Sequence, residues 1–228
     1  MEHEVILKQE SLRDQVLGIL KSRVIVGEFA AGEIYSSTAI AQELGVSSSP
    51  VREALLSLVD MGLMEPVRNR GFRIREMSES ARNEVVAIRT LLEVPAMMSL
   101  CDHQDSLREL QPQIEAHMAE IEACAARNDL VGYLAADRKF HLQMLGVLKN
   151  QRLIQMVNML RDQTSLVGLS KLYASRELMA EALSHRAIFK AILAGDRTKV
   201  RQLMTEHMRS NAGPEYQPGP TPIELDRI

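Results

Sequence analysis

The chain has 228 residues, which is long enough for one large or two modest domains that each bury a core. Its 46% hydrophobic and 25% charged residues are ordinary for a soluble globular protein, and no run of about 18 apolar residues could span a membrane. The net charge of −3 argues weakly against nucleic-acid binding, although phosphate contact depends on where the cations lie. Composition therefore excludes a membrane-spanning or strongly basic protein and leaves other functions open.

The N-terminal segment and the two cysteines indicate in which compartment the protein works. The N-terminus carries no basic segment followed by an apolar one, so no signal peptide is visible. Cys101 and Cys124 lack the spacing of a metal or redox site, and we expect two reduced thiols. Together these features predict a cytoplasmic protein.

Residues 11–75 have the element order of a winged helix-turn-helix domain. The spacing of apolar and capping residues predicts, in chain order, helices near 11–26 and 36–44, a helix between Ser47 and Gly62, and strands at 64–67 and 72–74. Gly45 marks the tight turn between the second and third helices. The usual role of this order is to place the helix after the turn in the DNA major groove.

Polar and basic side chains gather where such a domain would meet DNA. In the third helix Val51, Leu55 and Leu58 face inward, which turns Arg52 outward. The hairpin segment 68–75 carries four arginines and no acid, so we expect localised, salt-sensitive DNA affinity. The candidate DNA-contacting residues are Ser48, Ser49, Arg52, Arg68, Arg70 and Gly71.

The hydrophobic pattern is helical throughout from about residue 79 to residue 211. Its breaks predict six helices, at about 79–101, 105–127, 129–148, 151–170, 176–194 and 196–211. Residues 212–228 are rich in Pro and Gly, and we expect a loose tail there. The expected protein is mainly α, with an N-terminal winged helix-turn-helix domain at 1–76 followed by an all-α helical bundle at 77–211.

Polar side chains interrupt the apolar faces of three of these helices. Asp137 and His141 share one face of their helix, while His185 and His207 lie on the inward faces of the last two helices. Burying them without partners would be costly, so they satisfy one another or bind an ion. One carboxylate and three imidazoles suit a divalent ion such as Zn²⁺, Ni²⁺ or Mn²⁺, which the pattern does not distinguish. Each histidine taken singly is explained more simply as a hydrogen-bonded core residue.

Arg89 is a further charged residue on an apolar face. A buried arginine usually pairs with a carboxylate, and an internal acid such as Asp137 or Glu93 is one candidate partner. The alternative is a clamp on the carboxylate of a small ligand, which suits the forked guanidinium group. Loosely defined spacing adds Asn150 and Arg161 as candidates for the lining of such a cavity.

The stretch from Gly45 to Leu55, with the arginine-rich hairpin, resembles the GntR family of bacterial transcriptional regulators. The helical half resembles the FCD domain of the FadR-type branch of that family. Together the two resemblances cover about residues 10–210. The motifs in the helical half are Arg89-Thr90-Leu91-Leu92-Glu93, Asp137-Arg138-Lys139-Phe140-His141, His185 and His207.

This resemblance implies a regulator rather than an enzyme. It implies a homodimer that binds a pseudo-palindromic DNA operator and responds to a small effector, often a carboxylate. It also implies that Asp137, His141, His185 and His207 bind a metal beside the effector cavity, and it favours Arg89 as an effector-binding residue. Arg52 matches a position that reads a base edge, most naturally guanine, and the tip of the wing matches a segment that reaches the minor groove or the backbone.

The chain departs from the family pattern in the DNA-binding domain. Family members commonly carry Glu-Arg at the position of Ser37-Thr38 and an arginine at the position of Ser48. The operator sequence is therefore not predicted. Two other functions stay open: a regulator in which the metal is a structural staple or is itself the signal, and a metal-dependent hydrolase. The hydrolase would need a general base beside the metal, and no convincing candidate is evident.

Overall fold

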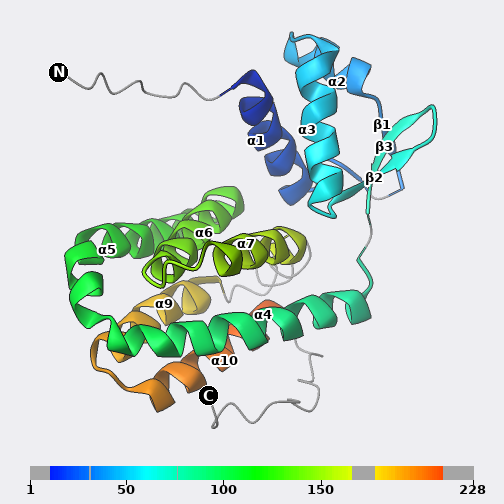
Figure 1. The fold of residues 1–228 in the computed structure, drawn as a ribbon. Helices are drawn as coiled ribbons and strands as arrows, with labels where there is room; N and C mark the ends of the chain where they lie inside the picture. The colour runs from blue at the N-terminus through cyan, green and yellow to red at the C-terminus, as the bar shows by residue number, and fades with distance from the viewer. Residues whose placement is uncertain (1–10, 31, 76, 166–177, 213–228) are drawn as a thin grey trace, which may run out of the picture. The chain divides into compact units, whose positions relative to one another are not determined.

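The computed structural model describes residues 11–30, 32–75, 77–165 and 178–212. Its contacts divide the chain into two compact units, Met1–Glu76 and Met77–Ile228, and each is described by itself. The fold is mainly α, as predicted, with a small sheet in the first unit (Figure 1). Among the described residues, no helix is both long and apolar enough to cross a membrane.

The first unit is a winged helix-turn-helix domain. Its helices and its hairpin lie close to the predicted ranges. One further strand, β1, was not predicted, because two residues are too short to show an alternating pattern. The elements are α1 (Leu12–Ile25), β1 (Ile34–Tyr35), α2 (Ser37–Leu44), α3 (Ser48–Asp60), β2 (Met64–Val67) and β3 (Gly71–Ile74).

The core of this unit lies between α1 and α3. Val51, Leu55 and Leu58 are all fully buried in α3, which confirms the predicted inward face, and α1 contributes Val16 and Leu20. The turn before α3 works as predicted, because Gly45 ends α2 in the left-handed conformation with φ of 67°. Because this apolar stripe faces the core, the opposite face of α3 points outward and can contact other molecules.

The three strands form an antiparallel sheet in the order β1-β3-β2. Gly71 opens β3 with φ of 134°, a conformation that side-chain-bearing residues rarely adopt. A Cβ atom at this position would also collide with the backbone carbonyl of Tyr35 in β1. The unpredicted strand therefore supplies a second reason for glycine at the position where the wing turn meets β3.

The second unit contains six α-helices within its described residues, as predicted. A 3-10 turn, η1, replaces the end of the first predicted helix. Predicted helical residues 166–170 and 176–177, and tail residues 213–228, lie outside the described residues. The elements are α4 (Glu79–Ser99), η1 (Leu100–Asp102), α5 (Gln104–Arg127), α6 (Leu130–Gly146), α7 (Gln151–Ser165), α9 (Leu178–Leu193) and α10 (Arg197–Ala212).

The helices of the second unit surround one core. α5 packs on α6 and α9, while α4 packs on α7 and α10 (Figure 1). Residues such as Phe140, Ile188 and Met204 are fully buried between them. Ten of the buried residues that the structure describes in this unit are nevertheless polar or charged and lie on α4, α6, α7, α9 and α10: Arg82, Arg89, Glu93, His141, Arg161, Asp162, Thr164, Glu181, His185 and His207. This concentration of buried charge marks the candidate site.

Candidate metal centre and DNA-contact surface

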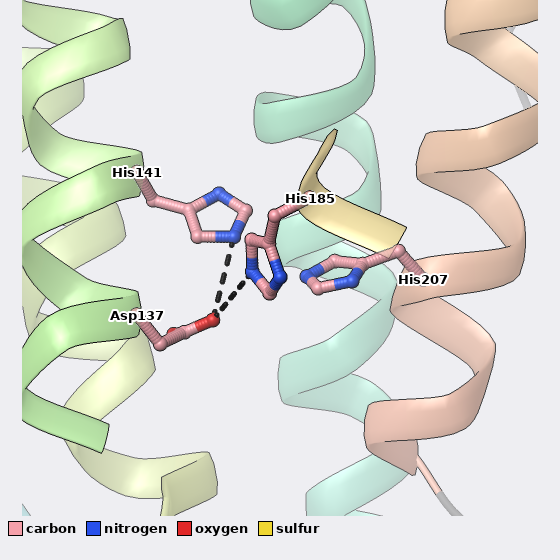
Figure 2. A group of neighbouring side chains, drawn as sticks. All are labelled: Asp137, His141, His185 and His207. Atoms are coloured by element: carbon pink, nitrogen blue, oxygen red, sulfur yellow. Dashed lines mark hydrogen bonds and ion pairs between the residues drawn. The ribbon is translucent and has the colours of Figure 1, made fainter. Parts of the chain in front are cut away.

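Four side chains from three helices meet in the core of the second unit. Asp137 and His141 project from α6, His185 from α9 and His207 from α10 (Figure 2). One donor atom from each residue lies within 4.8 Å of the others. The three histidines are at most 2% exposed. The structure thus brings together the four residues that the sequence pattern nominated as metal ligands.

The contacts of His185 leave a place for a cation. Its Nδ1 lies 3.1 Å from the carbonyl oxygen of Ala182, which only accepts hydrogen bonds, so Nδ1 carries a proton. Its Nε2 lies 2.9 Å from Asp137 Oδ1, which is also an acceptor. A neutral imidazole has a single N–H, so a second proton or a cation must lie between Nε2 and the carboxylate. A metal ion bound by both atoms satisfies that requirement.

His141 has unmet hydrogen-bonding capacity. Among the described residues, neither of its ring nitrogens makes a hydrogen bond. The ring is fully buried; Nε2 lies 3.6 Å from Asp137 Oδ1 and Nδ1 lies 3.5 Å from Glu93 Oε2. Burial, followed by the positive charge of Arg161, holds the pKa of His141 well below its ordinary value. A neutral imidazole with open nitrogens is the form that binds a metal.

Asp137 is held as a carboxylate. Burial alone would raise its pKa, but the charge of Arg161 and the neighbouring histidines outweigh burial and hold the pKa well below its ordinary value. Its other oxygen, Oδ2, accepts a hydrogen bond of 2.6 Å from Arg161 Nη1. The aspartate is therefore ready to act as an anionic ligand.

The donor set fits a divalent transition metal. With ligand bonds of about 2.1 Å, two donors on opposite sides of one ion lie about 4.2 Å apart, so donors within 4.8 Å need only small shifts. Three imidazoles and one carboxylate are compatible with Zn²⁺, Ni²⁺ or Mn²⁺. The open nitrogens of His141 and the acceptor pair at His185 and Asp137 support this fit.

A chain of buried ion pairs leads from the cluster to α4. Arg161 Nη2 donates to Glu93 Oε2 at 2.7 Å, and Arg89 Nε donates to Glu93 Oε1 at 2.8 Å. Arg89 Nη1 donates to Thr164 Oγ1 at 2.8 Å. Of the two partners suggested for Arg89, Glu93 is the one that it contacts directly. Among the described residues, Arg89 Nη2 has no hydrogen-bond partner, which leaves the two N–H groups of this nitrogen for a ligand.

His207 has its own acidic neighbour. Its Nδ1 lies 2.6 Å from Glu181 Oε1 and 3.1 Å from Ser184 Oγ. Burial would raise the pKa of Glu181, but its contact with His207 and the hydrogen bond from Ser210 lower the pKa overall. The cluster is therefore surrounded by ionised acids on α4 and α9.

Sequence reasoning left parts of this network out. Arg161 was nominated only loosely, and Glu181 was not nominated, although it lies one turn before His185 beside the predicted apolar stripe of α9. Helical spacing around Arg89 predicts an inward face of Val85, Arg89, Leu92 and Ala96. Arg89 and Ala96 are buried, but Val85 and Leu92 are only half-buried, and Arg82, Val86 and Glu93 lie on the buried face instead. Asn150 is exposed and accepts a hydrogen bond from the backbone N–H of Leu153, at the start of α7.

The first unit presents a separate polar surface. The α3 residues Ser48, Ser49 and Arg52 are exposed, as are Arg68 and Arg70 in the wing. A hollow between α3 and the wing is lined by Ser36, Ser37, Arg52, Leu56 and residues 66–72, which include Gly71. Within the described residues Arg52, Arg68 and Arg70 form no ion pair, whereas Arg73 pairs with Glu65 at 2.5 Å. Three unpaired guanidinium groups are thus available to phosphates or bases.

Comparisons with known proteins assign both units. Residues 12–74 match the model of the bacterial regulatory proteins of the gntR family, and residues 84–210 match the model of the FCD domain. The two matches cover the helix-turn-helix unit and the helical unit with the Asp/His cluster.

Several known regulators match the chain over most of their length and most of its own. The chain is 28% identical over 203 residues to a probable D-xylose utilization operon transcriptional repressor of Paenarthrobacter nicotinovorans, covering 89% of this chain and 88% of the relative. It is 26% identical to the regulator McbR of Escherichia coli, covering 92% and 96% of the two chains. The solved structure of E. coli McbR/YncC superposes with a TM-score of 0.73 at 25% identity, covering 89% of this chain and 96% of that one. The chain therefore belongs to the GntR family of DNA-binding transcriptional regulators, in the branch that carries an FCD ligand-binding domain.

Proposed function

We propose that a small carboxylate metabolite, bound beside a divalent metal in the helical unit, controls the binding of this regulator to its operator. We further propose that the regulator acts as a cytoplasmic homodimer, with residues 1–76 binding DNA, residues 77–211 binding the effector and 212–228 forming a tail. The observation that carries the proposal is the buried Asp/His cluster, which ion pairs connect to Arg161, Glu93 and Arg89.

Asp137, His141, His185 and His207 are the proposed metal ligands. When bound, the metal supplies a positive charge and a Lewis-acid position that attracts a carboxylate. The protein's part is to hold one anionic and three neutral donors at one point, away from water. A buried site that already contains ionised acids would repel an incoming anion without such a cation.

Arg89 is the proposed effector clamp. The N–H groups of Arg89 Nη2 can bind an anion without breaking the bonds of this arginine to Glu93 and Thr164. The neighbouring Arg161 joins α7 to Glu93 on α4 and to Asp137 on α6. An effector that draws Arg161 away from Glu93 or Asp137 would therefore change the contacts between α4, α6 and α7, which is how it would favour one arrangement of the dimer over another.

The proposed DNA contacts divide into two kinds. Arg52, with Ser48 and Ser49 beside it on α3, would meet base edges in the major groove, and Arg52 most naturally reads guanine. Arg68, Arg70 and the backbone at Gly71 would meet the minor groove or phosphates. Two copies related by a two-fold axis would then read the two halves of a pseudo-palindromic operator.

The test is a thermal-shift panel on metal-loaded protein, with metal-stripped protein as the control. The panel contains small carboxylic acids, together with sugars and sugar acids because one relative is described as a D-xylose operon repressor. A ligand that binds the native state stabilises it and so raises the melting temperature. At a free ligand concentration of a hundred times its Kd, the added free energy of unfolding is about 2.7 kcal/mol. We expect one chemical class to give a shift only when metal is present, and to change operator affinity in a gel-shift assay.

His185→Ala and His117→Ala serve as matched histidine variants, because His117 on α5 lies outside the cluster. The first should lose both the metal shift and the effector shift, and the second should keep both. A flat panel, with a large shift on metal addition alone, would instead identify the metal as a structural staple or as the signal.

A further inference from the structure

We propose that Glu181 is a positioning residue of the metal centre, which fixes the tautomer and orientation of His207 so that this histidine offers Nε2 to the ion. The inference rests on the proposed metal site. It extends that site beyond its four ligands to a residue on α9 that does not touch the ion.

Glu181 is anchored to α10 through both of its carboxylate oxygens. Oε1 lies 2.6 Å from His207 Nδ1, and Oε2 accepts a hydrogen bond of 2.5 Å from Ser210 Oγ. Glu181 is 7% exposed and His207 is 2% exposed, so the pair is shielded from solvent. The carboxylate therefore reaches from α9 to one turn of α10, with a hydrogen bond to Oε2 and an ion-pair contact at Oε1.

This contact selects one tautomer of His207. Both groups that face Nδ1 are acceptors: the Glu181 carboxylate at 2.6 Å, and Ser184 Oγ at 3.1 Å, whose own proton goes to the backbone carbonyl oxygen of Glu181. The imidazole proton therefore lies on Nδ1, and Nε2 is the ring nitrogen that can bind a cation. In Figure 2 the ring of His207 is directed from α10 toward His185 and the other ligands. A carboxylate behind a ligating imidazole holds the ring in place and makes it a stronger donor.

The other two histidines have weaker support behind the ring. His185 Nδ1 faces the neutral carbonyl oxygen of Ala182 at 3.1 Å, and His141 Nδ1 lies 3.5 Å from Glu93 Oε2. Glu181 provides the shortest of the three contacts, and it is anionic. Loss of its charge is therefore expected to affect the metal more than loss of either other contact.

A purely structural pairing of α9 with α10 would produce the same geometry, so the test must separate stability from metal binding. The experiment uses the full chain, stripped of metal, titrated with Zn²⁺ against a chelator of known affinity. Glu181→Gln keeps the size of the side chain and removes its charge. Glu206→Gln is the matched control, because Glu206 is exposed on α10 next to His207 and accepts a hydrogen bond from Gln202.

We expect Glu181→Gln to weaken Zn²⁺ affinity by about 10- to 100-fold while one equivalent still binds at saturation. Glu206→Gln should match the unaltered protein. A lower melting temperature of the metal-free variant with unchanged Zn²⁺ affinity would overturn the proposal. If the unaltered chain itself bound no Zn²⁺, Ni²⁺ or Mn²⁺, the proposed metal site would fail instead, which keeps the two failures distinguishable.

A double-mutant cycle tests whether Glu181 acts through His207. In a His207→Ala background, Glu181→Gln should cause no further loss of Zn²⁺ affinity, because the ring that it positions is absent. An equal fold-change in both backgrounds would contradict the positioning role. Should Glu181→Gln fail to fold, Ser210→Ala, which removes only the hydroxyl bound to Glu181, is expected to weaken Zn²⁺ binding by a smaller factor, and unchanged affinity would count against the proposal.

Discussion

Arg161 joins carboxylates on two different helices inside the helical unit. It donates to Asp137 on α6 at 2.6 Å and to Glu93 on α4 at 2.7 Å, and all three groups are buried or nearly so. Burial would lower the pKa of Arg161, but the two carboxylates more than offset it and raise the pKa. The arginine therefore stays charged, and the two acids depend on it for neutralisation.

Arg161→Met removes this charge and keeps most of the apolar stem. It leaves Glu93 and Asp137 short of a buried partner, which typically costs about 3–5 kcal/mol. We expect a loss of this size in urea unfolding of the metal-free protein, and a smaller loss once metal neutralises Asp137. Arg108→Met is the control, because its partner Asp105 is 96% exposed, and it should match the unaltered protein. If Arg161→Met changed the free energy of unfolding as little as Arg108→Met does, the buried ion pairs would not stabilise the fold.

Sequence spacing nominated the four residues of the Asp/His cluster but not the residues that contact them from neighbouring helices. Asp137 and His141 are four residues apart on one helix, so spacing alone places them on one face. Arg161 and Glu181 act across helices, on partners that lie 24 and 26 residues away in the chain, and helical periodicity does not specify which faces meet. The sequence shows only that Arg161 and Glu181 are charged residues beside apolar stripes. This indicates an unusual role but does not identify the partner of either residue.

At the scale of elements, the wing illustrates a second limit of sequence reasoning. The hairpin was predictable because its strands flank a turn-forming tripeptide, whereas β1 consists of two residues and shows no pattern of its own. Yet β1 pairs with β3 in the register Tyr35 to Phe72, and its backbone is the reason that Gly71 has no room for a side chain. A small unpredicted element thus constrains a predicted one.

Gly71→Ala is expected to destabilise the wing. The new Cβ would meet the Tyr35 carbonyl, and a φ of 134° is strained for any residue with a side chain. We expect a cost of about 1–3 kcal/mol in thermal unfolding, together with weaker operator binding. Gly18→Ala is the matched control: it lies inside α1 with open space around it, and it should stabilise the helix by up to about 1 kcal/mol. Equal stability of the two variants would remove the argument for strain at the wing.

At the scale of the whole molecule, charge sets the character of DNA binding. The chain carries a net charge of −3, so its overall field does not attract DNA, and affinity depends on a few local cations. Arg52, Arg68 and Arg70 are exposed and form no ion pair within the described part of the first unit. In a dimer, the two wing arginines of each copy would give about four phosphate contacts.

The salt dependence of operator binding follows from that count. The slope of log K against log salt concentration is about −0.9 per phosphate contact, so we expect a slope of about −3 to −4 for the dimer. Arg70→Ala should weaken binding to all sequences and reduce the slope by about two, one contact for each copy.

Arg52→Ala should leave the slope nearly unchanged and lower operator affinity by about 1–3 kcal/mol, because a base reader contributes to specificity. The measurement is fluorescence anisotropy on operator and scrambled duplexes over a salt series. An Arg52→Ala variant that weakens both duplexes equally would assign this arginine to the phosphate backbone instead. Because the chain also departs from the family pattern at Ser37, Thr38 and Ser48, other residues of α3 would then have to read the bases.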